Sequence, residues 1–324
     1  MTQPKTVYIT RLLPKPVMAA LRERYTLIAE PADNPIPTDD DRQRGFAQAD
    51  AVICTLADPI TAALLAVAPR LKIIANYAVG YNNIDVAAAT RRGIVVTNTP
   101  DVLTDATADL TWALLLAVTR RVVEGDHWTR SGQWPGWAPT QMLGTDVTGK
   151  TLGIIGMGRI GQAVALRAHG FRMPVLYASR RPCPPSPGIT TWTHRPLETV
   201  LTEADFISLH IPLADTTRHL MGLRELAMMK STAFLINTSR GPVVDEAALL
   251  TALRQGTIAG AGLDVYEREP VILSGLEQLS NVVLLPHLGS ATQQVRIKMG
   301  LLCVENIASV LGGRPPLNPV NQGV

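Results

Sequence analysis

The sequence predicts an α/β protein of two domains, each built on a parallel sheet. Short β-branched segments occur singly and alternate with longer helical segments, which indicates βα units rather than hairpins. The length of 324 residues is sufficient for two domains with substantial cores. Apolar residues make up 46% of the chain and charged residues 18%, a balance that indicates a packed globular protein and excludes a disordered one.

The first series of strands and helices occupies the N-terminal part of the chain. Its expected strands are Val7–Ile9, Ala51–Ile53, Ile73–Ile74 and Ile94–Val96, and its expected helices are Pro16–Arg24, Thr61–Val67 and Asp85–Arg91. A long periodic segment then predicts one continuous helix from Leu103 to about Arg130, with Gly132 just past its end. We expect this helix to connect the two domains.

A second series follows the connecting helix. Its expected strands are Leu152–Ile155, Val175–Tyr177, Phe206–Leu209, Phe234–Ile236, Ala259–Val265 and Val282–Leu285. The segment Gly289–Thr292 then begins another helix, which runs to about Leu311 and is long enough to return the chain to the first domain. The first domain is therefore expected to be discontinuous, with residues 1–100 and 291–324 in one domain and residues 101–290 in the other.

A glycine-rich loop joins the Leu152–Ile155 strand to the next helix. It reads Gly156-Met157-Gly158-Arg159-Ile160-Gly161, which is the G-x-G-x-x-G spacing of dinucleotide-binding loops. The first glycine permits a tight turn, the second lets the backbone approach a pyrophosphate, and the third lets the helix pack closely, while the helix N-terminus attracts the anion. Placed between an apolar strand and a helix, the loop predicts a Rossmann-like, doubly wound domain for a dinucleotide cofactor.

The residues after the second strand of this domain bear on which cofactor is bound. NAD-binding versions usually place an acidic residue there, about 20 residues beyond the loop, to bind the ribose 2′-hydroxyl. Here the strand is followed by Ser179, Arg180 and Arg181. Because arginine binds phosphate through a bidentate fork, these residues predict a preference for NADPH. NADH is the alternative cofactor, and a solvated pair of loop charges is the alternative role for the arginines.

Three chemically active side chains each stand just beyond an expected strand. They are Arg240, Glu269 and His287. Because ligands of an open parallel sheet bind beyond the carboxyl ends of its strands, we expect the three side chains to converge beside the nicotinamide. Each residue alone has an ordinary interpretation as a turn arginine, a surface glutamate or a helix-start histidine. Four other histidines are expected on the surface of helices or loops: His127, His169, His194 and His219. His210 either lines the cofactor crevice or has a structural role.

Composition also limits the partners and the cellular setting. Lysine and arginine total 30 against 27 aspartate and glutamate, and no basic run is long enough to follow a nucleic-acid backbone, so no nucleic-acid partner is expected. No apolar segment approaches the ~20 residues of a membrane span, so no membrane partner is expected. Three cysteines without metal-ligand spacing predict reduced thiols and no metal site, and with an N-terminus that lacks an export signal they predict a cytoplasmic protein.

Several stretches of the sequence resemble the D-isomer-specific 2-hydroxyacid dehydrogenase family, over nearly the whole chain. They are Asn76–Asp85, Gly149–Gly161, Asn237–Glu246 and Pro286–Thr292. Two further segments, Gly132–Pro139 and Gly161–Met173, are closest to the family's glyoxylate/hydroxypyruvate reductases. The resemblance implies NADPH-dependent reduction of a short 2-oxo acid, glyoxylate or hydroxypyruvate, to the D-2-hydroxy acid. It also implies that the discontinuous domain is a flavodoxin-like substrate domain and that residues 101–290 bind the dinucleotide.

The resemblance assigns roles to the three residues at the strand ends. Arg240 pairs with the substrate carboxylate and polarises its ketone. His287, as imidazolium, is the general acid that gives a proton while hydride arrives from the nicotinamide, and Glu269 holds and charges the imidazole. Between Glu269 and His287, the segment Val271–Asn281 lacks the extra prolines and acidic residues typical of the family, which affects the expected loop path and not the pair.

A wider set of contacts is also implied by the resemblance. Val79 and Gly80 of the first domain offer backbone N–H groups to the substrate carboxylate, and Ser290 either touches the substrate or caps the following helix. Asp264 either lies near the nicotinamide carboxamide or caps its strand end. The remaining residues expected to bind the cofactor are Gly156, Gly158, Arg159, Ile160, Gly161, Ser179, Arg180, Arg181, Pro212, Thr217, Thr238, Ser239 and Gly289.

Large apolar side chains on the loop after the long helix bear on assembly. Trp134, Trp137 and Met142 either pack back onto their own subunit or are buried by a second copy. The resemblance favours a twofold homodimer through the nucleotide domain, with this loop crossing the interface. Gln141 and Met142 would then help to set substrate size in the neighbouring subunit.

Two other functions are compatible with the sequence. One is a dehydrogenase of the same fold for another small anion, a bulkier 2-oxo acid or phosphite, because Leu56, Tyr77 and Met142 define no pocket volume from sequence alone. The other is a non-catalytic nucleotide-sensing regulator, which the fold alone does not exclude. A regulator would tolerate loss of the proton donor or its partner, whereas here the full catalytic set is present.

Overall fold

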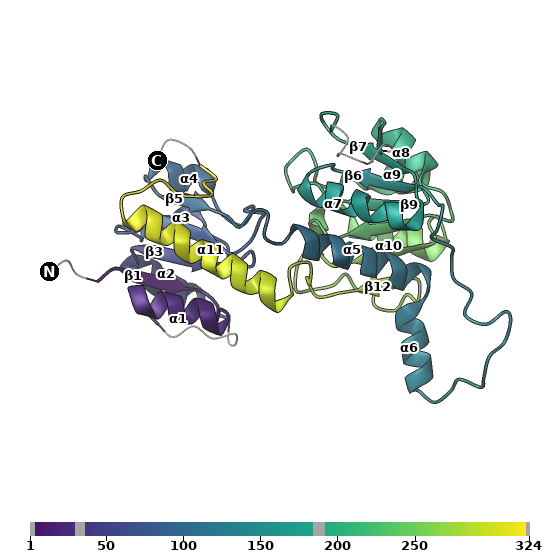
Figure 1. The fold of residues 1–324 in the computed structure, drawn as a ribbon, viewed down its shortest axis with the longest axis horizontal. Coiled ribbons are helices and arrows are strands. Elements are labelled where there is room, and N and C mark those ends of the chain that lie inside the picture. The colour runs from purple at the N-terminus through teal and green to yellow at the C-terminus, as the bar shows by residue number, and fades with distance from the viewer. Residues whose placement is uncertain (1–3, 30–35, 184–191, 322–324) are drawn as a thin grey trace. The chain divides into compact units, whose positions relative to one another are not determined.

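The computed structural model describes residues 4–29, 36–183 and 192–321, and these form two compact units (Figure 1). Unit 1 contains Met1–Leu103 and Ala291–Val324, and unit 2 contains Thr104–Ser290. Each unit is built on one parallel sheet with helices packed against it. The α/β class and the two parallel sheets predicted from the sequence are therefore confirmed.

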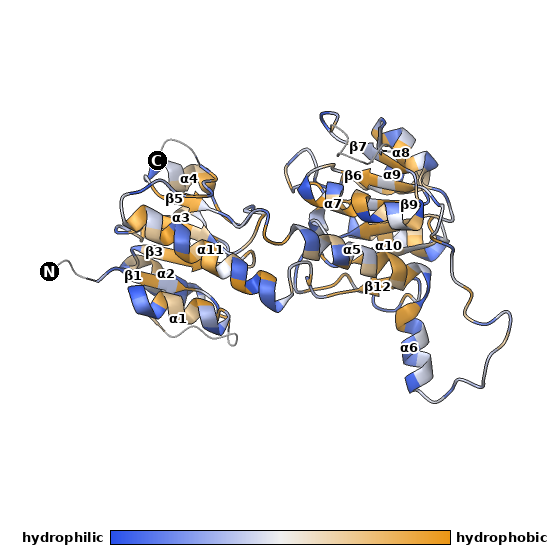
Figure 2. Cartoon of the chain, viewed as in Figure 1, coloured by the Kyte–Doolittle hydropathy of each residue, from blue (hydrophilic) through white to orange (hydrophobic). Residues whose placement is uncertain are grey.

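The sheet of unit 1 has the strand order β2-β1-β3-β4-β5, and neighbouring strands run parallel. This is the 2-1-3-4-5 order of flavodoxin-like sheets. The strands are rich in buried Val, Ile and Ala (Figure 2), as expected for parallel strands that are covered on both faces. The strands are β1 (Thr6–Ile9), β2 (Thr26–Leu27), β3 (Ala51–Cys54), β4 (Ile73–Asn76) and β5 (Val95–Thr97).

The helices of unit 1 come from both ends of the chain. They are α1 (Lys15–Arg24), α2 (Asp39–Gln48), α3 (Ala62–Ala66), α4 (Val86–Arg91) and α11 (Gln293–Leu311). Phe46 of α2 and Leu65 of α3 share a hydrophobic cluster with Ile74 of the sheet. Helix α1 packs on α11, where a Cβ at Gly300 would lie 2.5 Å from Cγ2 of Val17. The helix near the C-terminus thus completes the core of the N-terminal segment.

The sheet of unit 2 has the order β12-β11-β10-β9-β6-β7-β8, again with parallel neighbours. The order reverses between β6 and β9, so ligands are expected beyond the carboxyl ends of these central strands. The strands are β6 (Leu152–Ile155), β7 (Val175–Ala178), β8 (Trp192–His194), β9 (Phe206–Leu209), β10 (Phe234–Asn237), β11 (Gly260–Leu263) and β12 (Val282–Leu284).

Helices cover unit 2 through two separate hydrophobic clusters. One cluster contains Trp112 of α5 and Val164 of α7, and the Nε1–H of Trp112 donates to the Val164 carbonyl at 3.1 Å. The other contains Leu226 of α9 and Leu249 of α10. The helices are α5 (Thr104–Thr119), α6 (Val122–Arg130), α7 (Arg159–Ala168), α8 (Leu197–Glu203), α9 (Leu223–Met228) and α10 (Glu246–Gln255), with short 3-10 helices η1 (His169–Phe171) and η2 (Gly241–Val243).

The prediction of one continuous helix from Leu103 to Arg130 is wrong, because the chain breaks between α5 and α6. Arg121 has φ +52°, in the left-handed region, and its guanidinium pairs with Glu124 at 2.6 Å. The carbonyl of Thr119 accepts the N–H of Thr145 at 2.8 Å, which ties the end of α5 to a later segment. Against the rest of the described chain, none of the residues of α6 is buried. No contact with the core therefore holds α6 in line with α5, and the two helices are separate.

Residues 120–144 form an arm on unit 2, made of α6 and the loop that follows it (Figure 1). The arm begins and ends at one place, where the Thr145 N–H donates to the Thr119 carbonyl. Gly144 lies so close there that a Cβ would be 2.6 Å from the Thr119 oxygen. Trp137 is 83% exposed, so its indole is not covered by its own subunit, and Trp134 is 51% exposed.

Among the helices of the described residues, none is long and apolar enough to cross a membrane. Nor do these residues gather three or more His, Cys, Asp or Glu side chains in a group that could hold a metal ion.

Candidate active site

The glycine-rich loop lies between β6 and α7, and two of its glycines are required by close backbone contacts. Gly156 has φ +101°, and a Cβ there would lie 2.6 Å from the carbonyl oxygen of His210. A Cβ at Gly161 would lie 2.1 Å from the carbonyl oxygen of Gly156. A larger residue at Gly161 would push α7 away from the turn, and one at Gly156 would need a left-handed backbone and would meet the His210 carbonyl. This agrees with the close helix packing expected for Gly161 and the tight turn expected for Gly156.

Gly158 differs from Gly156 and Gly161 because no residue of the described chain crowds it. No atom of the described residues lies within 4 Å of the Cβ that it lacks, and Gly158 is exposed. It precedes α7, whose first turn contains no acidic residue and receives no capping bond from a side chain of the described chain. The first N–H groups of α7 and the helix dipole therefore face a space in which an anion is favoured. This fits the pyrophosphate of a dinucleotide.

Ser179, Arg180 and Arg181 follow β7, on the strand next to β6. Both arginines are exposed, and the Ser179 hydroxyl donates to the Arg181 carbonyl at 2.5 Å, which fixes the turn. His194 approaches the same turn, with Nε2 3.1 Å from the Ser179 carbonyl. Two exposed guanidinium groups at the end of this strand suit a ribose 2′-phosphate better than a free 2′-hydroxyl.

His287 and Glu269 form a direct pair. The Nδ1 of His287 lies 2.8 Å from Oε2 of Glu269, and Oε1 of the same carboxylate accepts the Tyr266 N–H at 3.1 Å. Burial alone would raise the pKa of Glu269, but the hydrogen bond and charge of His287 and the N–H of Tyr266 lower it, and the net pKa lies below its usual value. Glu269 is therefore a carboxylate at neutral pH, so Nδ1 donates and Nε2 is left to face a ligand.

The loop that carries His287 is held by Asp264. The His287 residue has φ +55°, a left-handed conformation that is uncommon outside glycine. Its N–H donates to the Asp264 carbonyl at 2.9 Å, and the N–H groups of Leu288 and Gly289 donate to the two carboxylate oxygens at 2.6 and 2.8 Å. Burial raises the pKa of Asp264. Asp264 thus holds the loop that carries His287, and its expected contact with the nicotinamide carboxamide stays a prediction.

Arg240 stands in a tight turn after β10 that Asn237 shapes. Oδ1 of Asn237 accepts the N–H and hydroxyl of Ser239 at 3.0 and 2.8 Å, and Nδ2 donates to the Arg240 carbonyl at 3.0 Å. Burial lowers the pKa of Arg240, and the nearby Glu269 charge raises it. The ordinary pKa of arginine is far above neutral pH, so the guanidinium remains charged. The strand ends therefore bring Arg240, Glu269 and His287 together in unit 2.

In unit 1, two asparagines orient the loop that contains Val79 and Gly80. Asn76, at the end of β4, donates from Nδ2 to the Gly80 carbonyl at 2.8 Å. Asn98, just past β5, donates from Nδ2 to the Val79 carbonyl at 2.8 Å. Within the described chain, no acceptor receives the backbone N–H of Val79 or Gly80. Because the two asparagines hold the carbonyls of this loop, the adjacent N–H groups of Val79 and Gly80 are held in place as well. Two such adjacent N–H groups suit a carboxylate ligand.

The other residues expected to bind the cofactor make contacts within unit 2 or begin α7. The Thr217 hydroxyl donates to the carbonyl of the exposed Pro212 at 2.7 Å. The Thr238 hydroxyl lies 2.9 Å from that of Thr111 in α5. Gly289 is buried, with its carbonyl accepting the Thr107 hydroxyl at 3.0 Å. Arg159 and Ile160 begin α7 beside Gly158.

Three smaller expectations concern Ser290, His210 and His219. The N-terminal cap of α11 is Thr292, whose hydroxyl accepts the Val295 N–H at 3.2 Å, so Ser290 is not the cap. His210 is half-buried beside the glycine-rich loop with Nε2 2.8 Å from the Ser208 hydroxyl, and burial lowers its pKa to about 3. His219, expected to have no special context, lies 3.2 Å from Glu267.

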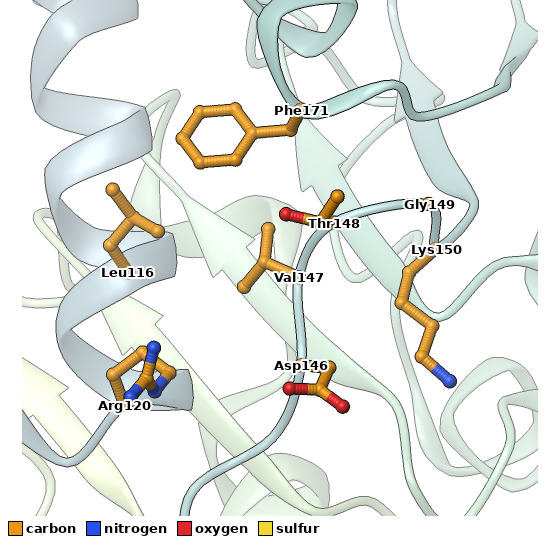
Figure 3. Close-up of a pocket in the computed structure, with 8 residues that line it drawn as sticks. All are labelled: Leu116, Arg120, Asp146, Val147, Thr148, Gly149, Lys150 and Phe171. Carbon is orange, nitrogen blue, oxygen red and sulfur yellow. The ribbon is translucent and has the colours of Figure 1, made fainter.

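A pocket of about 490 Å³ lies elsewhere in unit 2 (Figure 3). Thr148, Gly149 and Lys150 line it, and they precede β6, whereas the catalytic candidates follow their strands. Because the strands are parallel, this pocket is at the opposite edge of the sheet from Arg240 and His287. It is not part of the candidate active site.

Comparison with known proteins decides the family. Residues 112–289 match the model of the D-isomer-specific 2-hydroxyacid dehydrogenase NAD-binding domain. The chain belongs to this family. The match spans the glycine-rich loop and all three catalytic candidates, so the dehydrogenase carries its NAD-binding domain in unit 2.

Relatives of this dehydrogenase extend over almost its full length. It is 49% identical over 322 residues to a glyoxylate reductase of Thermococcus gammatolerans, covering 98% of this chain and 96% of the relative. A crystal structure of the TT0316 protein from Thermus thermophilus has a TM-score of 0.91 and 47% identity, and covers 98% of this chain and 100% of that one. The structure of an NADPH-dependent glyoxylate/hydroxypyruvate reductase from Sinorhizobium meliloti in complex with NADP and malonate has a TM-score of 0.85 and 34% identity. The match covers 99% of this chain and 100% of that one.

Sequence reasoning missed the residues of the dehydrogenase that hold the candidate residues in place. Asn76 and Asn98 stand at strand ends, which is a usable signal for polar side chains at the ligand edge. Asn237 shows the same signal before Arg240. Glu246 and Glu267, described below, carry no such signal, because each acts on a backbone N–H of a distant segment.

Proposed function

We propose that the protein reduces a short 2-oxo acid, glyoxylate or hydroxypyruvate, to the D-2-hydroxy acid with NADPH. The observation that carries this proposal is the His287–Glu269 pair at 2.8 Å, next to Arg240 at the strand ends of the NAD-binding domain. Relatives at 46–50% identity carry the name glyoxylate reductase, which supports the substrate class.

The residues of the site act on the two polar ends of the substrate. Arg240 binds the carboxylate and draws electron density from the ketone oxygen. When bound, the nicotinamide supplies the hydride to the carbonyl carbon. His287 gives its Nε2 proton to the ketone oxygen, which becomes the new hydroxyl. Glu269 keeps Nδ1 occupied and stabilises the positive imidazolium before transfer.

Three further residues complete the proposed substrate contacts. The N–H groups of Val79 and Gly80 bind the substrate carboxylate, because Asn76 and Asn98 hold the carbonyls of the same loop. Ser290, next to the buried Gly289, contacts the substrate with its hydroxyl. For the cofactor, α7 binds the pyrophosphate, Ser179, Arg180 and Arg181 bind the 2′-phosphate, and Pro212, Thr217, Thr238, Ser239, Asp264 and Gly289 line the remaining length.

One assay panel tests the function. Purified protein is offered NADPH or NADH with glyoxylate, hydroxypyruvate, pyruvate and a branched 2-oxo acid, and nicotinamide absorbance is followed. We expect the highest kcat/KM with NADPH and one of the first two acids. A higher kcat/KM with the branched acid, or NADP⁺ reduction with phosphite alone, would assign another small-anion substrate. Cofactor binding without turnover of any substrate would favour the nucleotide-sensing regulator.

The cofactor preference depends on the two exposed arginines. The double change Arg180→Ala with Arg181→Ala should reduce the NADPH to NADH ratio of kcat/KM by at least tenfold, since charge-assisted bonds to phosphate contribute about 1.5–3 kcal/mol each. Arg224→Ala removes an exposed arginine of α9 and serves as the matched control. An unchanged ratio in the double variant would contradict the phosphate assignment.

We propose a twofold homodimer through unit 2, in which the arm of residues 120–144 contacts the second copy. The supporting observation is the exposure of Trp134, Trp137 and Leu143 on an arm that lacks core contacts of its own. Exposed apolar side chains gathered on one segment are typical of subunit interfaces. Gln141 and Met142 would help to set substrate size in the partner's site.

The dimer proposal predicts a defect from one substitution in the arm. Trp137→Glu should weaken dimerisation and glyoxylate turnover together, because a twofold interface repeats the change. Light scattering and kinetics at the same protein concentration measure both effects. Leu223→Glu, which alters an exposed leucine at the start of α9, is the control. A wild-type monomer with full activity at micromolar concentration would refute the proposal.

A further inference from the structure

Two glutamates, the buried Glu246 and the partly buried Glu267, bind each other's backbone. The Glu246 N–H donates to Oε1 of Glu267 at 2.9 Å, and the Glu267 N–H donates to Oε1 of Glu246 at 2.7 Å. Glu246 is only 6% exposed. Two carboxylates in such proximity repel each other, and burial together with the charges of Glu267 and Glu269 raises the pKa of Glu246. This costly arrangement has no part in the reaction steps described above.

The pair joins the chain segments that carry two catalytic candidates. Glu246 is the first residue of α10, shortly after Arg240, and Glu267 stands just before Glu269. The two segments also touch through their backbones. A Cβ at Gly241 would lie 1.8 Å from the Tyr266 carbonyl carbon and 2.4 Å from the Glu267 nitrogen. The Arg240 turn and the Glu269 turn are therefore in direct contact, and the Glu246–Glu267 pair spans that contact.

His219 adds a third segment to the same cluster. Its Nε2 lies 3.2 Å from Oε2 of Glu267, on the carboxylate oxygen that Glu246 does not use. The His219 N–H donates to the Pro242 carbonyl at 2.8 Å, next to Gly241. His219 is exposed on its other side and has φ +52°. The His219 backbone is thus bound to the segment that follows Arg240, while its side chain orients the Glu267 carboxylate.

The bonds of this cluster lead directly to the proton donor. The peptide between Tyr266 and Glu267 is held by Glu246 through the Glu267 N–H. The adjacent Tyr266 N–H donates to Oε1 of Glu269, whose Oε2 holds His287. The Tyr266 hydroxyl also donates to the Leu285 carbonyl at 2.9 Å, on the segment that leads to His287. Freedom in the Tyr266–Glu267 peptide would therefore move the carboxylate of Glu269.

We propose that Glu246 and Glu267, oriented by His219, are positioning residues of the reduction, which keep Arg240 and the Glu269–His287 pair in register. This inference rests on the proposed function. Neither glutamate is among the residues proposed above to contact the cofactor or the substrate. A misplacement of about 1 Å at a reacting group can cost about 100-fold in rate, which is the scale on which such positioning acts.

Two substitutions at position 246 separate positioning from general stability. Glu246→Ala should lower kcat by about 10- to 100-fold with the Kd for NADPH within about twofold of wild type. Glu246→Gln keeps a side-chain oxygen that accepts the Glu267 N–H, so it should restore kcat to within about threefold. The control is Glu277→Ala, which removes a comparable bond, the Gly275 N–H to Glu277 Oε2 at 2.7 Å, elsewhere in unit 2.

The reciprocal geometry predicts a non-additive double variant. Glu267→Ala should reduce kcat as Glu246→Ala does, and the double variant should lose little more than the worse single one, because either change breaks the same pair. Thermal unfolding of every variant is measured alongside. Unchanged kcat in Glu246→Ala, a fall equal to that of Glu277→Ala, or fully additive losses would overturn the inference. An inactive wild type on the substrate panel would instead reject the proposed function.

Discussion

Replacing His287 by alanine is expected to lower kcat by about 10²- to 10⁴-fold while NADPH binding survives, since general acid catalysis contributes on this scale. The reason is geometric. Glu269 occupies Nδ1 at 2.8 Å, so the proton for the ketone oxygen comes from Nε2, and alanine offers no donor there. Stopped-flow or steady-state reduction of glyoxylate measures the loss, and NADPH fluorescence measures cofactor binding.

The left-handed backbone at His287 calls for a second variant. Asparagine adopts φ near +55° more readily than alanine, so His287→Asn should keep the loop fold and still lack the acid. Both variants should therefore be equally slow. His169→Ala changes an exposed histidine of η1, outside the proposed site, and should be nearly as active as wild type. Normal turnover by His287→Asn would place the proton donor on another residue and favour the regulator.

Replacing Arg240 by alanine should reduce kcat/KM by about 30- to 4,000-fold, which corresponds to the ~2–5 kcal/mol cost of removing one partner of a buried charged pair. The guanidinium is expected to act in binding and in polarising the ketone, so KM should rise and kcat should fall together. This pattern differs from His287→Ala, in which kcat carries most of the loss.

Arg240→Lys provides the matched comparison. Lysine keeps the positive charge but lacks the planar fork, so it should recover only part of the lost kcat/KM. The measurement is a full kinetic series with glyoxylate at saturating NADPH. Complete recovery by lysine would show that charge alone suffices, and an unchanged KM in Arg240→Ala would place the substrate carboxylate on other groups.

Much of the fold follows from short-range patterns in the sequence. Runs such as Ala51–Cys54 are apolar on both faces, which is what parallel strands between helix layers require. The helix break at Arg121 was not predictable in the same way. Val122 and Val123 continue the apolar pattern of α5, but in the structure they are more than half exposed, so the pattern there does not describe core contact.

The candidate site was predictable where a residue type meets a strand end. Arg240, Glu269 and His287 were expected at one edge for that reason, and the structure brings them together in unit 2. The supports were not predictable, because each is a bond between distant segments. Asp264 binds N–H groups of Leu288 and Gly289, and Glu246 binds that of Glu267. A side-chain oxygen that accepts a backbone N–H of another segment leaves no periodicity or spacing in the sequence.

The closed base of the arm makes it a separable module. Since the Thr145 N–H meets the Thr119 carbonyl, the chain leaves and rejoins α5 at one point, and the intervening length is a loop in the polymer sense. The entropy of closing such a loop grows only with the logarithm of its length, about 0.6 kcal/mol for each doubling. Changes in the length of this arm should therefore alter the stability of the sheet little, so evolution or protein engineering can vary how far the arm reaches, and through the proposed dimer what it brings to the partner's site, without disturbing the fold of unit 2.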